Sequence, residues 1–209
     1  MQIRKFRHSC LLVSDGDARV LIDPGIFATG VDALTDLTAV LITHAHQDHL
    51  DPQALGRVLA ANPQATVYAD GGSAAQLSES GTAVTEVRPG DVLDVGTRVQ
   101  VSGGEHAVIH ADIPTVPNVC YLVGGRLYHP GDSLVPPAEP VEVLAVPVAA
   151  PWMAAKEGVD FLRAVAPARA LPIHEQVLSS TAMAYRLLST LAPQGTQWVD
   201  IDDGSVLDI

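Results

Sequence analysis

Residues 43–51 are Thr43-His44-Ala45-His46-Gln47-Asp48-His49-Leu50-Asp51, which places three histidines and an aspartate within six positions. The mainly apolar run at residues 38–42 precedes this stretch and is typical of a buried strand. Asp51 and Pro52 follow it, and this pair predicts the N-cap and the first position of a helix. The histidines are therefore expected on a loop between a strand and a helix, where a rigid scaffold holds functional side chains in place.

The residue types in this loop point to a metal site. Imidazole and carboxylate are natural ligands for a borderline divalent ion such as zinc. Side chains two residues apart on extended backbone point the same way, so His44 and His46 are expected to reach one ion together. Asp48 and His49 lie where the chain turns toward the helix, beside a second ion. A set of solvated loop histidines is the alternative, but this spacing rarely arises by chance.

Composition narrows the fold and the class of partner. The 209 residues are 47% hydrophobic and 17% charged, which predicts one domain over residues 1–209 with a sizeable core, built from two similar halves. The net charge of −12 argues against binding to nucleic acid or to an anionic membrane. It favours a small-molecule substrate, and it leaves a homo-oligomer open.

Cys10 and Cys120 lie in apolar runs and are expected to be small core residues, not a disulfide or metal ligands. No apolar run approaches the length of a membrane span. The first residues enter a strand pattern at once, without the features of a signal peptide, so the cytoplasm is the expected compartment.

Hydrophobic periodicity predicts alternating strands and helices. Two strands at 3–14 and 18–23 are joined by a turn, and residues 83–102 alternate like three antiparallel strands. Helices are expected at 52–61, 72–79, 155–166 and 180–191, and further strands at 65–69, 141–148 and 168–173. Residues 117–132 are expected to contain a hairpin, and residues 198–204 a final strand and an acidic tail. Residues 9–25 and 118–132 share the order of a cysteine, an apolar trio, a glycine turn, an arginine, an apolar strand and an aspartate near Pro-Gly. This repeat suggests two related β-rich halves.

The H-x-H-x-D-H pattern of residues 44–49 resembles the signature of the metallo-β-lactamase superfamily. The resemblance extends from Asp23 to His174 and implies a four-layer αββα sandwich, with two mixed sheets face to face and helices outside. It also implies that a third histidine ligand follows the glycine pair at 103–104. His106 and His110 are both candidates, and His106 is preferred because it follows the strand directly.

In this resemblance the remaining ligands come from two later motifs. Asp132, in Gly131-Asp132-Ser133, takes the place of a carboxylate that bridges two ions, and His174 follows the strand at 168–173. One ion would be held by His44, His46 and His106, and the other by Asp48, His49 and His174. Three further residues are expected beside or behind the ligands, where they orient them: Asp23, His8 and His110.

The implied chemistry is metal-assisted hydrolysis with two divalent ions, of which zinc is preferred and manganese or iron are alternatives. A water between two such ions loses a proton near neutral pH, and Asp48 would also carry a proton to the leaving group. The early histidine and the Gly-Asp-Ser segment are similar to the branch that includes L-ascorbate 6-phosphate lactonase. Small esters, lactones, phosphodiesters and amides all stay open as substrates.

Two other functions remain open on the same fold. One is a mononuclear iron oxidoreductase similar to a persulfide dioxygenase, and the other is a non-catalytic metal-binding protein. Trp152 lies in an apolar loop at 149–153 that is expected to line the mouth of the site, and packing is the preferred role for its ring.

Overall fold

The strand patterns assemble into two seven-stranded mixed sheets in a computed structural model that describes residues 1–209. The first sheet has the order β14 (Val206–Asp208), β1 (Gln2–Lys5), β2 (Leu11–Asp15), β3 (Ala18–Ile22), β4 (Ala39–Ile42), β5 (Thr66–Ala69) and β6 (Thr85–Glu86). The second has the order β7 (Val92–Asp94), β8 (Arg98–Glu105), β9 (Pro117–Val123), β10 (Leu127–His129), β11 (Val143–Pro147), β12 (Arg169–Ile173) and β13 (Gln197–Trp198).

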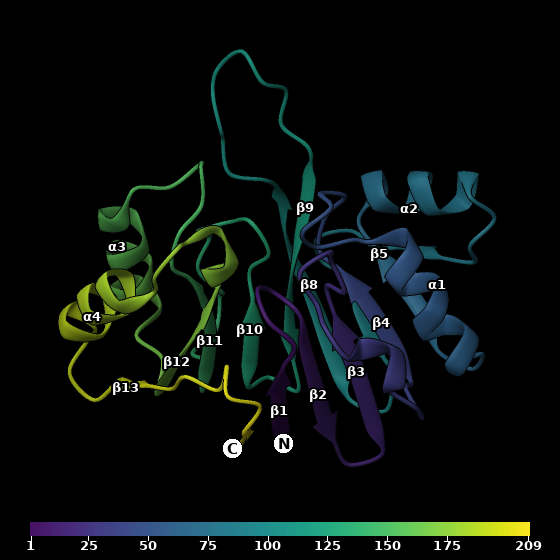
Figure 1. Cartoon of the computed structure of the whole chain (residues 1–209), viewed down its shortest axis with the longest axis horizontal. Coiled ribbons are helices and arrows are strands. Elements are labelled where there is room, and N and C mark those ends of the chain that lie inside the picture. The colour runs from purple at the N-terminus through teal and green to yellow at the C-terminus, as the bar shows by residue number, and fades with distance from the viewer.

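The two sheets pack face to face and carry helices on their outer faces, which confirms the predicted αββα sandwich (Figure 1). The first sheet is covered by α1 (Pro52–Ala61) and α2 (Gly71–Glu79), and the second by α3 (Ala155–Val165) and α4 (Ala182–Leu191). Two short 3-10 helices, η1 (Val31–Ala33) and η2 (Glu175–Val177), complete the chain. None of the helices is both long and apolar enough to span a membrane.

Aliphatic side chains fill three buried layers, as the scarcity of aromatic residues requires. The layer between the sheets includes Leu11, Ile22, Tyr121, Val143 and Leu171. A second layer joins the first sheet to α1 and α2, and a third joins the second sheet to α3 and α4. Burial of this apolar surface is the main favourable term in folding, and it holds the ends of the strands in fixed positions.

The two sheets have the same arrangement of strands, as the repeat between residues 9–25 and 118–132 suggested. In each sheet the first three strand pairs are antiparallel and the next three are parallel. Helices follow the equivalent strands, since α1 follows β4 as α3 follows β11. Cys10 packs beneath the helices of the first sheet and Cys120 beneath those of the second. Loops that leave equivalent strand ends therefore meet at one edge of the sandwich.

Three features differ from the predicted elements. The strand expected at 3–14 is broken at residues 6–10, where Arg7 and His8 take the left-handed conformation with φ of 70° and 51°. The strand β6 pairs in parallel with β5 in the first sheet, so residues 83–102 are not one antiparallel unit. The C-terminal residues 206–208 form β14 beside β1, beyond the final strand and acidic tail expected over residues 198–204. Each difference depends on partners distant in sequence.

Both cysteines are buried and free, as expected for core residues. Burial raises the pKa of the Cys120 thiol to about 11 and that of Cys10 well above its ordinary value. Because the thiolate is the reactive form, neither residue is expected to react with a thiol reagent such as iodoacetamide at pH 8 in the native protein. Mass spectrometry should find both alkylated only after unfolding in guanidinium, and rapid labelling of the native chain would contradict the packing described.

Candidate metal centre

The candidate residues gather where strands from both sheets end. Asp23 follows β3, residues 43–49 follow β4, His106 follows β8 and Asp132 lies just beyond β10. His174 directly follows β12, and His8 lies in the turn between β1 and β2. These side chains form two adjacent groups, and within each group the ligand atoms lie within 4.8 Å of one another. One group is His44, His46, His106 and Asp132. The other is His8, Asp48, His49 and His174. We call them the first and the second cluster.

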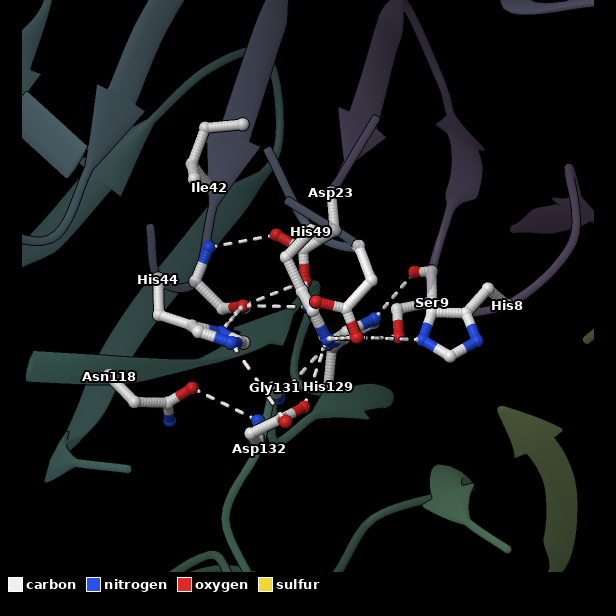
Figure 2. A network of polar contacts seen from close by, with 12 residues as sticks. His8, Ser9, Asp23, Ile42, His44, His49, Asn118, His129, Gly131 and Asp132 are labelled. Carbon is white, nitrogen blue, oxygen red and sulfur yellow. Dashed lines mark hydrogen bonds and ion pairs between the residues drawn. The ribbon is translucent and has the colours of Figure 1, made fainter. Parts of the chain in front are cut away.

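Asp132 lies between the two clusters and presents one oxygen to each. Its Oδ1 is 2.9 Å from His49 Nε2 and 2.7 Å from His174 Nε2. Its Oδ2 is 3.1 Å from His106 Nε2 and 3.9 Å from His44 Nε2. The Asp132 main-chain N–H donates to Asn118 Oδ1 at 3.0 Å, which fixes the carboxylate from behind (Figure 2). The geometry therefore suits a carboxylate shared by two ions.

Hydrogen bonds at Nδ1, the ring nitrogen that points away from the clusters, orient three of the histidine rings. His49 Nδ1 donates to Asp23 Oδ2 at 2.6 Å, and His106 Nδ1 donates to the carbonyl of Ala107 at 2.5 Å. His44 Nδ1 donates to Thr43 Oγ1 at 3.1 Å, because that hydroxyl gives its own proton to Asp23 Oδ2 at 2.7 Å. Each ring thus points Nε2 toward Asp132 and the clusters, which is the orientation of a metal ligand.

A divalent cation fits both clusters. The Nε2 atoms of His49 and His174 face each other at 3.1 Å, and the buried His44 Nε2 has no hydrogen-bond partner. Buried polar atoms normally have a partner, and a cation would satisfy these lone pairs together. The set of imidazoles and carboxylates is also the set that zinc and similar ions prefer.

The charge states of His44 and of the two carboxylates suit ligation, whereas His49 must release a proton when an ion binds. Burial opposes the charge of His49, but Asp132 and Asp23 hold its pKa well above the ordinary value. Burial lowers the pKa of His44 well below its ordinary value, so the ring stays neutral at pH 7 with its lone pair available. Burial alone would raise the pKa of Asp48, but the hydrogen bond from His8 and the nearby His49 outweigh it, and the pKa falls to about 2. Burial also opposes the charge of Asp132, yet His174 and His49 hold its pKa well below the ordinary value. Both carboxylates are therefore ionised at neutral pH, as ligation requires.

The loop at residues 43–49 is held in shape by close contact with residues 24–26. Ile26 N donates to Gln47 O at 2.9 Å, and Asp51 N donates to Pro24 O at 3.1 Å. A Cβ atom at Gly25 would lie 2.0 Å from the main-chain oxygen of Asp48. Only glycine can bring these two segments so close.

Asp23 is fully buried at the start of this contact and supports the loop from behind. Its Oδ1 accepts from Thr43 N at 2.8 Å, and its Oδ2 accepts from His49 and Thr43 (Figure 2). The sequence placed Asp23 behind the ligands on resemblance alone, and the structure places it against His49.

An Asp23→Asn variant is expected to bind metal about 10- to 100-fold more weakly, the usual cost of losing a partner behind a ligand. The new amide would donate to His49 Nδ1 and leave the proton on Nε2, which then could not bind an ion. Zinc titration of the metal-free protein measures the change. Asp15→Asn is the control, because Asp15 accepts from Thr97 Oγ1 at 2.8 Å, lies 4.0 Å from the N-terminal ammonium and stands outside both clusters. Equal affinities in the two variants would contradict the role.

Of the two histidines that could follow the glycine pair, only His106 lies in a cluster. The Ala107 main-chain N–H donates to Asp132 O at 2.8 Å, and the chain then leaves the site in the loop that projects beyond the body between β8 and β9 (Figure 1). His110 lies in this loop with its side chain 65% exposed, and its ring contacts only Asp112. The expectation that His110 supports the ligands is therefore wrong, because residues 107–109 carry the chain into the projecting loop before His110 is reached.

His8 and His129 lie near the clusters in different roles. His8 Nε2 is 3.2 Å from Asp48 Oδ2, so its ring faces the second cluster directly and not from behind a ligand. His129 accepts from Gly131 N at 3.2 Å and donates to Ser9 O at 2.9 Å, which makes it a structural link between the two sheets.

Two residues make contacts at the site that the sequence did not predict. Trp152 Nε1 donates to Asp132 Oδ2 at 2.7 Å, so the indole holds the shared carboxylate in addition to packing. Its loop follows β11 as the histidine loop follows β4, and the loop at 149–153 was expected to line the mouth of the site, so the contact with Asp132 and not the location is new. Glu175, buried next to His174, accepts from the His8 main-chain N–H at 2.6 Å.

Comparison with known proteins places the chain in a family. The family model described as the beta-lactamase superfamily domain matches residues 2–174. Protein Rv0786c of Mycobacterium tuberculosis is 50% identical over 188 residues, which cover 87% of each chain. A UPF0173 metal-dependent hydrolase of Pyrobaculum arsenaticum is 24% identical over 194 residues, covering 83% of this chain and 84% of that protein.

Among solved structures, Igni18, a metallo hydrolase from the archaeon Ignicoccus hospitalis, has a TM-score of 0.73 at 18% identity and covers 100% of this chain and 98% of that one. This likeness concerns the fold, whereas the family model covers most of the sequence. The chain therefore belongs to the metallo-β-lactamase superfamily.

Proposed function

We propose that this protein is a metal-dependent hydrolase with two divalent ions, zinc by preference, that cleaves a small-molecule ester, lactone, phosphodiester or amide. The observation that supports it best is the position of Asp132, whose two oxygens face two separate clusters of histidine nitrogens. His44, His46 and His106 would hold one ion and Asp48, His49 and His174 the other. When bound, such ions supply a nucleophilic hydroxide at neutral pH and polarise the substrate oxygen.

Other features of the protein would hold the shared ligand in place and leave one side of the site open to a substrate. Asp48 has a side chain that is 25% exposed, whereas those of His49, Asp132 and His174 are 0–4% exposed. Asp48 thus lies at the open side of the site, where it can pass a proton to the leaving group of a bound substrate. Trp152 and Asn118 hold the Asp132 carboxylate and its main chain, so the shared ligand stays fixed during turnover.

The side of the first cluster that faces the projecting loop is partly apolar and has a small hollow. The hollow is lined by His46 and His106 and by aliphatic residues of the projecting loop, among them Ile109, Ile113 and Val116. Neither lysine nor arginine lines this hollow. An uncharged lactone or ester suits such a lining, and the placement of His8 near the clusters adds to the likeness to the lactonase-like branch.

The proposal is tested with a substrate panel. The protein is stripped with a chelator, reloaded with zinc or manganese, and assayed against an aliphatic lactone, a p-nitrophenyl ester, bis-p-nitrophenyl phosphate and a p-nitroanilide. Hydrolysis of at least one class is expected, with loss on chelation and recovery on reloading. A protein that holds two ions and hydrolyses none of the four classes would contradict the proposal.

A further inference from the structure

A buried ion pair lies on the far side of the second cluster from the first. Glu175 and Lys5 have side chains that are 2% and 0% exposed, and Lys5 Nζ is 2.6 Å from Glu175 Oε2. Lys5 also donates to the carbonyl of Pro172 at 2.7 Å and pairs with Asp202 Oδ1 at 2.8 Å. The pair joins the first strand, the end of β12 and the C-terminal segment.

Glu175 contacts two turns that each carry a histidine of the second cluster. It follows His174 directly in the chain, and its Oε1 accepts from the His8 main-chain N–H at 2.6 Å. His8 and His174 both have positive φ, of 51° and 69°, and Arg7 has a φ of 70°. A residue other than glycine holds this conformation only where its surroundings enforce it. The turn around His8 is closed by the main-chain bonds from Phe6 N to Cys10 O and from Cys10 N to Arg7 O, and Glu175 adds the bond that ties it to the second sheet.

The two turns bring their imidazoles together. The rings of His8 and His174 have centroids 4.4 Å apart, and both belong to the second cluster with Asp48 and His49. No residue of the first cluster contacts Glu175 or Lys5 through a hydrogen bond or ion pair. A change at Glu175 would therefore act on one cluster and leave the other in place.

Stability alone does not account for the pair. A buried ion pair is commonly no better for stability than apolar residues of the same volume, because both charges lose their hydration. Lys5 already has Asp202 and the Pro172 carbonyl as partners. Glu175 Oε1 also accepts from the neighbouring Gln176 Nε2 at 3.1 Å, and its shorter bond is the one from the His8 main chain at 2.6 Å, which links it to a residue of the second cluster.

We propose that Glu175, with its charge balanced by Lys5, is a positioning residue that holds His8 toward His174 and thereby sets the metal affinity of the second cluster. His8 then serves that cluster as a further donor. The inference deepens the function proposed above and rests on its second ion.

The test is a cobalt titration of the metal-free protein, followed by the visible absorption of bound Co²⁺. Wild-type protein is expected to show two binding events. Glu175→Ala is expected to weaken the second event about 10- to 100-fold and to leave the first within threefold, since loss of an orienting partner costs that much affinity. The matched control is Glu142→Ala, which removes a carboxylate that bridges Arg126 and Arg169 away from both clusters.

A double variant separates positioning from the charge pair itself. In Glu175→Gln combined with Lys5→Met, the amide oxygen can still accept from the His8 N–H while both charges are gone. Recovery of the second event to within threefold of wild type is expected. Hydrogen exchange in the metal-free protein adds a reading that does not depend on metal, because the His8 amide should lose protection in Glu175→Ala and keep it in the double variant.

The outcomes separate the inference from the proposed function. Two events in wild type and an unchanged second event in Glu175→Ala would overturn the inference and leave the function intact, as would a lowered melting temperature with both affinities kept. A wild-type protein with a single event would overturn the dinuclear site, and the inference with it. Selective loss of the second event, with recovery in the double variant, supports both.

Discussion

Replacing Asp132 with asparagine is expected to lower kcat/KM of the metal-dependent hydrolysis by more than about 100-fold, since loss of even an orienting partner costs 10- to 100-fold. Asparagine keeps the shape of the side chain and its main-chain hydrogen bond to Asn118. It removes the charge that faces His49 and His174 on one side and His106 on the other. Two cations so close together need a shared anion, so binding of the pair should fail first.

The measurement combines metal content with kinetics of the best substrate from the panel. Asp132→Asn is expected to retain one ion or none per chain after dialysis, with the fold preserved by circular dichroism. The control is Trp152→Phe, which keeps the carboxylate but removes the indole that donates to it at 2.7 Å. That variant should keep both ions and lose about 10-fold in kcat/KM, the low end for an orienting partner. Full metal content and activity in Asp132→Asn would contradict the shared-ligand role.

Replacing Gly25 with alanine is expected to destabilise the protein by at least about 3 kcal/mol, the upper part of the range for an overpacked site. The new methyl group would lie 2.0 Å from the main-chain oxygen of Asp48 and 2.6 Å from the nitrogen of His49. Main chain cannot swing aside as a flexible side chain can, so the histidine loop must move. Metal affinity should fall together with stability, because the loop carries candidate ligands of both clusters.

Urea unfolding of the metal-free protein measures this effect, and a zinc titration follows on the folded fraction. Gly56→Ala is the matched control, because a Cβ there meets nothing within 4 Å and the residue lies inside α1. Alanine is the better helix former, so that change should raise the free energy of unfolding by up to about 1 kcal/mol. A Gly25→Ala variant as stable as wild type would show that the two segments are not in close contact.

Much of the architecture follows from local sequence patterns. The helix predicted at 52–61 forms at those residues, with Asp51 as its N-cap accepting from Gln53 N at 2.9 Å. The apolar runs at 38–42, 141–148 and 168–173 become the central strands β4, β11 and β12. Periodicity and capping are local properties, so a single sequence suffices for them. The repeat between residues 9–25 and 118–132 extends to the whole of each sheet.

What escaped prediction depends on contacts between distant parts of the chain. The sequence pattern at residues 6–10 is that of a continuous strand, but the chain turns there with positive φ at Arg7 and His8. The His8 main chain donates to Glu175, which lies 167 residues away in the sequence. The choice between His106 and His110 depends on where the chain leaves the site, and that follows from the bond between Ala107 and Asp132. Lys5 lies on the same buried face of β1 as Ile3, and its partners Glu175 and Asp202 are far away in the sequence.

The location and number of bound ions test the central claim most directly. Crystals of the protein grown with zinc, with data collected on both sides of the zinc absorption edge, would show the ions by anomalous scattering. Two peaks are expected per chain, one among His44, His46 and His106 and the other among Asp48, His49 and His174, with Asp132 between them. A single peak, or peaks outside the two clusters, would contradict the dinuclear centre, and a single iron ion in the first cluster would favour an oxidoreductase instead.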